Sequence, residues 1–94
     1  FVRLFMIVRQ IVYKRNFIKK FQQLPALVQR LAAKKEKLFA SNPLHPSLRL
    51  HQLRGRLQDA WSISITLDYR IIFEREDDGV IVFVSIGRHA IYDR

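Results

Sequence analysis

Cysteine is absent from the sequence, and glycine and proline occur only three times each. The lack of cysteine excludes disulfide bonds and cysteine-based zinc sites, and it is compatible with a reducing compartment. The scarcity of glycine and proline argues against long unstructured loops. Because apolar residues make up 49% of the 94 residues, the chain can form a core, and its length fits one domain, which we assign to residues 1–94.

Long apolar runs are missing as well. Residues 1–12 are apolar, but Arg3 and Arg9 interrupt them, and a membrane-spanning helix needs ~20 residues. The stretch also lacks the small-residue cleavage site of a secretory signal. We therefore expect a cytoplasmic protein with no membrane partner. Residues 1–5 precede Met6, which opens the first regular segment, and we interpret them as an upstream extension or a cloning remnant.

Acidic residues are nearly absent from the first 40 residues, which hold ten Lys/Arg against Glu36 alone. Residues 41–94 hold seven Arg and seven Asp/Glu, so the whole net charge of +9 belongs to the N-terminal half. Such a concentration of cations indicates a nucleic acid or an acidic protein as the partner. Lysine-rich faces that only keep the protein soluble are the alternative.

The first 41 residues predict a strand followed by two helices. Residues 7–13 are rich in β-branched side chains and alternate roughly, which is typical of a strand. Residues 15–24 have apolar side chains at helical spacing. A second helix starts at Pro25 and ends before Pro43, because the residue before proline avoids the helical region. Its predicted buried stripe comprises Leu27, Val28, Leu31 and Leu38.

A second face of this helix is cationic. Arg30, Lys34 and Lys37 follow one another at spacings of four and three residues, and we call them the cationic ridge. We expect the ridge to contact the phosphates of an RNA partner.

The C-terminal half predicts short strands. Residues 49–53 are short and extended, and residues 61–67 alternate strictly between large apolar and hydroxyl side chains, which is typical of a half-buried strand. Residues 69–75 and 80–86 are apolar enough for central strands, with Asp78-Gly79 as a two-residue hairpin loop between them. The predicted fold is α+β: an N-terminal strand, a two-helix hairpin and a mainly antiparallel sheet of three to four strands, in the order β-α-α-β-β-β.

The predicted hairpin places Arg70 opposite Gly87, with Ser85 and His89 on the face of Arg70. A planar arginine fork can bind two phosphate oxygens and stabilise a transition state of higher negative charge. A histidine can transfer a proton at neutral pH, and Tyr92 adds a weak proton donor or a base-stacking ring. The alternatives are an ion pair of Arg70 with an acid such as Asp68, a surface histidine and a tyrosine that only covers the core.

Three segments of the chain resemble the RelE/ParE superfamily of type II toxins. They are residues 51–55 (HQLRG), 68–73 (DYRIIF) and 86–92 (IGRHAIY), and residues 13–38 look like the two-helix hairpin of that family. The resemblance implies a toxin neutralised by a cognate antitoxin protein. For the RelE-like and YafQ-like branches it implies an mRNA interferase that works on the ribosome, in which a ribose 2′-hydroxyl attacks the adjacent phosphate without metal or cofactor.

The resemblance also assigns site residues. Arg70 matches the transition-state arginine of the family, and Arg88, His89 and Tyr92 match its late catalytic positions. His51 lies close to a histidine of the YafQ-like branch. With the cationic ridge, the RNA-binding residues are then Arg54, which matches a basic residue near a Leu-x-Gly turn, His51, Lys34, Lys37 and Arg30.

Two other functions are compatible with the same fold, because fold alone does not decide function. A ParE-like inhibitor of DNA gyrase cuts no RNA, and an inactive relative would only bind it. The pair His89 and Tyr92 favours the nuclease, since ParE-like members generally lack it. A basic accessory protein of the ribosome or nucleoid is disfavoured by the balanced charge of residues 41–94.

Overall fold

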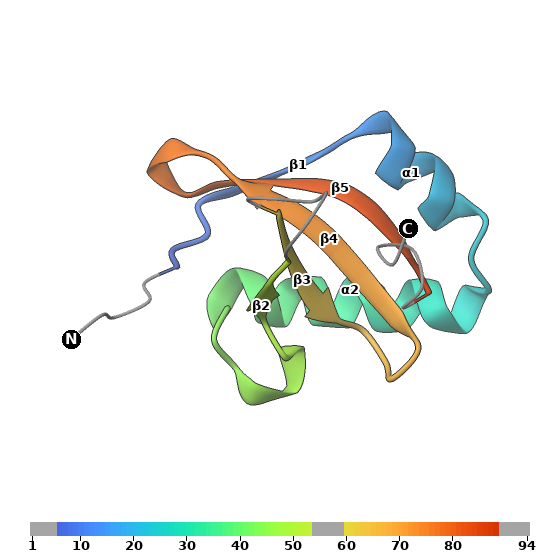
Figure 1. The fold of residues 1–94 in the computed structure, drawn as a ribbon. Coiled ribbons are helices and arrows are strands. Elements are labelled where there is room, and N and C mark those ends of the chain that lie inside the picture. The colour runs from blue at the N-terminus through green and yellow to red at the C-terminus, as the bar shows by residue number, and fades with distance from the viewer. Residues whose placement is uncertain (1–5, 54–59, 89–94) are drawn as a thin grey trace.

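The computed structural model describes residues 6–53 and 60–88 and has two helices and a five-stranded sheet of order β1-β5-β4-β3-β2 (Figure 1). The helices lie together on one face of the sheet. The elements are β1 (Gln10–Tyr13), α1 (Arg15–Gln22), α2 (Ala26–Ser41), β2 (His51–Gln52), β3 (Ala60–Ser64), β4 (Tyr69–Arg75) and β5 (Val80–Arg88), with 3₁₀ turns at Pro46–Leu48 and Asp77–Gly79.

The predicted α+β class and mainly antiparallel sheet are confirmed. β1 runs parallel to β5, and the other three pairings are antiparallel. The sheet has five strands rather than three to four, because the two-residue β2 joins its edge. Strand β1 begins at Gln10 rather than at residue 7, and just before it the Arg9 N–H donates to the Gly79 carbonyl at 2.9 Å.

The helices begin and end close to the predicted residues, but the buried stripe of α2 differs. Leu27 is 59% exposed, whereas Phe39 is fully buried and Ala32 lies beside it in the core. At about 100° per residue, Leu27 lies ~140° around the helix from Ala32 and so faces away from the sheet. The prediction for Leu27 is therefore wrong, and Phe39 is the anchor that it missed.

Phenylalanine rings join the helices to the sheet. The ring of Phe83 in β5 lies 5.3 Å from that of Phe17 in α1 and 6.0 Å from that of Phe39 in α2, measured between centroids. Phe73 in β4 lies 5.0 Å from Phe39 and 6.3 Å from Phe83. These tilted contacts at 5–6 Å are favourable for aromatic pairs. The core of the molecule is this cluster and the aliphatic side chains around it.

Strand β3 ends at Ser64, three residues earlier than predicted, because a turn starts there. The Thr66 hydroxyl accepts hydrogen bonds from the N–H groups of Asp68 and Tyr69 at 3.1 and 3.2 Å, and the Ile65 N–H donates to the Tyr69 carbonyl at 2.9 Å. A threonine hydroxyl that binds nearby backbone offers the chain an alternative to the strand ladder. Leu67, predicted to be buried, is 75% exposed in this turn.

The hydroxyl face of β3 is also covered. Ser62 and Ser64 are both buried, so β3 is not the half-buried strand that we expected. Ala60 and Ile72 are buried on the same face, where they pack with Leu53 in a second, smaller cluster.

In the β4–β5 hairpin, Arg70 pairs with Gly87 as predicted, but the turn and the register near it differ from the prediction. Its loop is the three-residue turn Asp77–Gly79, closed by the Glu76 N–H donating to the Val80 carbonyl at 2.8 Å, so the two-residue loop is wrong. Near the turn the register is therefore one residue from the predicted one. A bulge between Ile72 and Phe73 shifts it back, and Arg70 faces Gly87 as predicted.

Among the described residues, no helix is long and apolar enough to cross a membrane.

The packing predicts that two substitutions of large apolar residues by alanine in α2 have unequal effects on stability. Phe39→Ala should lower the free energy of unfolding by about 3–5 kcal/mol, because it leaves a cavity among Phe73 and Phe83. Leu27→Ala, its control, should change it by less than about 0.5 kcal/mol. Urea unfolding followed by circular dichroism measures both, and equal losses would contradict the assigned core.

Candidate functional site

Arg70 lies at the start of β4, between Ser64 of β3 and Gly87 of β5. Its side chain is only 9% exposed, and Nη1 donates a hydrogen bond to the Ser64 hydroxyl. The buried Nε has no hydrogen-bond partner in the structure. Asp68 is exposed, and the described part of the chain gives Arg70 no carboxylate partner, so the alternative of an Arg70–Asp68 ion pair is not realised.

A buried guanidinium with an unpaired N–H is unusual and unfavourable. Arginine stays protonated in proteins, and a buried donor without an acceptor costs about 1–3 kcal/mol. Buried polar groups in folded proteins nearly always have partners, so an unpaired one requires an explanation. An anion that accepts from Nε would remove the cost, and a phosphate suits the planar fork of arginine.

The face that holds Arg70 also holds other polar residues. Ser85 pairs with Ile72, two residues from Arg70, so it lies on the face of Arg70 as predicted. His51 pairs with Ser62, which places it on this face too, two strands from β4 and thus about 10 Å across the sheet. Its ring nitrogen Nδ1 lies 3.3 Å from the Arg49 carbonyl oxygen.

Arg88 and the cationic ridge lie elsewhere. Arg88 pairs with Tyr69 and is on the opposite face from Arg70, with its guanidinium carbon 5.6 Å from the centre of the Tyr69 ring. Arg30, Lys34 and Lys37 are all exposed on α2, as the spacing predicts, and α2 covers that same opposite face. Arg54, His89 and Tyr92 lie outside the described residues.

Sequence reasoning missed Ser64 as the partner of Arg70. Extending the strand to residue 67 concealed the turn at residues 65–68, which determines the β3–β4 register. Thr66 and Asp68, which flank Leu67, are residue types that form such turns, so they could have predicted that the strand ends before Leu67.

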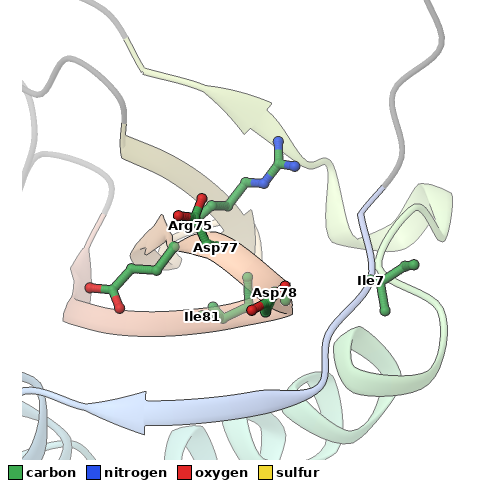
Figure 2. A pocket seen from close by; sticks show the side chains of 7 residues that line it. Ile7, Arg75, Asp77, Asp78 and Ile81 are labelled. Atoms are coloured by element: carbon green, nitrogen blue, oxygen red, sulfur yellow. The ribbon is translucent and has the colours of Figure 1, made fainter.

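A pocket of about 290 Å³ lies at the other end of β4, beside the β4–β5 turn (Figure 2). Arg75, Ile7 and Ile81 line it together with Glu76 and the turn Asp77–Gly79. Arg75 is five residues along the strand from Arg70, or about 16 Å. Three carboxylates in its lining make this pocket a poor site for a phosphate, so it is not part of the candidate site.

A more apolar groove of about 350 Å³ lies between β1 and the helices. It is lined by Tyr13, Phe17, Ile18, Phe21, Gln22 and Glu36. The Tyr13 hydroxyl donates a hydrogen bond to the Glu36 carboxylate. Burial first, and then this hydrogen bond and the negative charge of Glu36, raise the pKa of Tyr13 to about 12.

Comparison with solved structures defines the class of protein. The YoeB/ParE toxin from Agrobacterium tumefaciens matches with a TM-score of 0.72 at 15% identity, over 86% of this chain and 99% of that one. The archaeal RelE–RelB complex from Pyrococcus horikoshii OT3 matches with a TM-score of 0.69 at 20% identity, over 92% of this chain and 99% of that one. The E. coli DinJ–YafQ toxin–antitoxin complex matches with a TM-score of 0.68 at 21% identity, over 92% of this chain and 98% of that one. The fold is that of RelE/ParE-like toxins.

The sequence narrows this class to one family. The model of the YafQ family, described as the bacterial toxin of a type II toxin–antitoxin system, matches residues 7–92. Since this match spans nearly the whole chain, the protein belongs to the YafQ family of type II toxins. No protein of curated function matches the sequence.

The raised pKa of Tyr13 is testable by alkaline titration. The difference in tyrosinate absorbance between the wild type and Tyr13→Phe should have its midpoint near pH 12. Because the folded-state pKa exceeds the ordinary value of 10.0, the stabilising effect of the protonated phenol is complete below pH 10 and is lost as the pH rises towards 12. Glu36→Gln should lower the midpoint; a midpoint near 10 in the wild type would refute the contact.

Proposed function

We propose that this toxin is a ribosome-dependent mRNA endoribonuclease that inhibits translation. The observation that supports this function is the state of Arg70: it is buried, it has no carboxylate partner among the described residues, and its Nε lacks an acceptor. A scissile phosphate supplies the missing acceptor and the missing negative charge. The family assignment supports a toxin, and the resemblance to RelE-like and YafQ-like members supports RNA as its target.

The proposed reaction is an internal transesterification of RNA. The ribose 2′-oxygen bonds to the adjacent phosphorus, the bond from phosphorus to the 5′-oxygen breaks, and a 2′,3′-cyclic phosphate remains. A base takes the 2′-hydroxyl proton and an acid protonates the leaving 5′-oxygen. Arg70 stabilises the added charge of the pentacovalent phosphorus, and no metal or cofactor is required.

The remaining roles follow from residue chemistry. We assign His89 as a general acid or base and Tyr92 as a stacking ring. Because Arg88 lies on the opposite face of the sheet from Arg70, we assign it to a phosphate contact away from the reacting bond. His51 and Arg54 would contact the RNA near the sheet. Because the cationic ridge lies on the opposite face of the sheet, we assign it to ribosomal RNA rather than to the reacting strand.

A cognate antitoxin is the second proposed partner. Two structures that share this fold, the RelE–RelB and DinJ–YafQ proteins, were solved as toxin–antitoxin complexes. The apolar groove beside Tyr13 and Phe17 lies in the half of the chain that has ten cations and one acid. An acidic amphipathic segment that folds on binding suits such a surface.

Loss of the site should abolish cleavage. On induction in bacteria, the wild type should arrest growth and produce new cuts in a translated mRNA, detected by primer extension. Arg70→Ala should lower cleavage by about 10²–10³-fold, as for other removed oxyanion donors, and His89→Ala by about 10²–10⁴-fold. Arg75→Ala, at the far end of the same strand and stacked on Trp61, is the matched control and should remain active.

The same experiment separates the alternative functions. Growth arrest without new cuts, indifferent to His89→Ala, would contradict the nuclease and support inhibition of gyrase. Absence of any arrest would indicate an inactive relative.

The cationic ridge should determine the salt dependence of ribosome binding. Lys34→Gln with Lys37→Gln should reduce the slope of log K against log salt concentration by about 1 for each lysine, because each phosphate contact releases counterions. Lys19→Gln with Lys20→Gln, which removes the same charge from the last turn of α1, is the control. An equal change of slope in both pairs would show a diffuse charge effect rather than a ridge.

A further inference from the structure

Ser64 is the one described residue that binds the guanidinium of Arg70. The two residues face each other across the β3–β4 ladder, and Ser64 is itself only 5% exposed. Its hydroxyl accepts from Nη1, so one corner of the guanidinium is fixed. A hydrogen bond with a charged donor is stronger than one between neutral groups, and burial excludes the water that would compete with it.

This contact does not use the other edge of the guanidinium, whose Nε is buried and has no hydrogen-bond partner among the described residues. Nε and Nη2 form the edge with which arginine binds two oxygens of a phosphate in parallel. Nε has no partner in the structure, and no hydrogen bond of Nη2 is made to a described residue. Gly87, on the other side of Arg70, adds no side chain to the site.

The backbone holds Ser64 in a defined place. Ser64 is the last residue of β3, and the turn that follows is fixed by the Thr66 hydroxyl and by the hydrogen bond from Ile65 to Tyr69. The separation of Ser64 and Arg70 is therefore determined by a short hairpin. Sites on strands supported in this way are more precise than sites on loops.

We propose that Ser64 is a positioning residue, which orients Arg70 so that its Nε edge meets the scissile phosphate. Arginine has many rotamers of similar energy, and without the hydroxyl its guanidinium would sample several of them. The chemical step suffers when a catalytic group is misplaced by even about 1 Å. This role rests on the proposed nuclease function, because it acts only through Arg70.

The test is a double-mutant cycle on purified toxin and programmed ribosomes. In single-turnover cleavage, Ser64→Ala should lower the rate constant by about tenfold and leave the half-saturating ribosome concentration unchanged, because binding uses other residues. In an Arg70→Ala background, Ser64→Ala should have no further effect, since residues that act as a unit are not additive.

The chain offers a matched control on the same strand and face. Ser62→Ala removes a buried hydroxyl that has no hydrogen-bond partner, two residues from Ser64. This substitution should leave the cleavage rate constant unchanged and the free energy of unfolding unchanged or higher, because no hydrogen bond is lost. If Ser64→Ala does not fold, Ser64→Cys replaces it, since a thiol of similar shape is only a weak acceptor.

A second measurement does not depend on cleavage. In a ¹⁵N–¹H correlation spectrum, the Arg70 Nε–Hε group of the wild type should be rigid and slow to exchange with water. Ser64→Ala should make it mobile and fast to exchange, whereas Ser62→Ala should not. If the wild type cleaves no RNA, the proposed function fails, and this spectrum still decides whether Ser64 orients Arg70.

Three results would overturn the role of Ser64. They are a Ser64→Ala rate equal to that of the wild type, an equal loss of rate in the presence and absence of Arg70, and an Arg70 Nε signal that does not respond to Ser64→Ala.

Discussion

The contact of the Phe83 ring with Phe17 and Phe39 holds the two helices on the sheet. It joins the longest strand to both helices, and Phe73 extends it to the neighbouring strand. A chain of 94 residues has a small core and buries a smaller fraction of its surface than a larger domain does, so a few large rings contribute much of its stability. The buried face of α2 centres on Phe39, with Leu31 and Leu38 partly buried beside it as predicted, whereas Leu27 is exposed.

The same contact constrains the site on the other side of the sheet. Side chains of a regular strand alternate, so Phe83 and Gly87 would share one face if β5 were regular. The bulge, in which Val84 is the extra residue, reverses the alternation. Phe83 and Ile86 can then both be buried in the core with the helices, while Ser85 and Gly87 lie on the face of Arg70. The bulge thus allows one strand to serve both the core and the site.

Positive charge is exposed on one face of the sheet, where the helices lie, and buried on the other, where Arg70 lies. The helix face has exposed lysines, whose attraction for phosphates is long-ranged and sensitive to salt. Among the described residues, the other face has one buried arginine, which binds a serine and has no carboxylate partner. The first arrangement suits binding to a large polyanion, and the second suits a single phosphate at a defined position. The proposed nuclease, which would attach to the ribosome and then act on one bond, needs both.

The α+β class, the order of the elements and the exposed cationic ridge were predictable from the sequence, because apolar spacing and charge are local properties. The predicted hairpin also placed Arg70 opposite Gly87, but through two errors that cancelled: the loop is one residue longer than expected, and the bulge restores the register. The exposure of Leu27 and Leu67, the burial of Ser62 and the hydrogen bond between Arg70 and Ser64 were not predictable in this way. These outcomes depend on which surfaces meet across strands and helices, and no single segment contains that information.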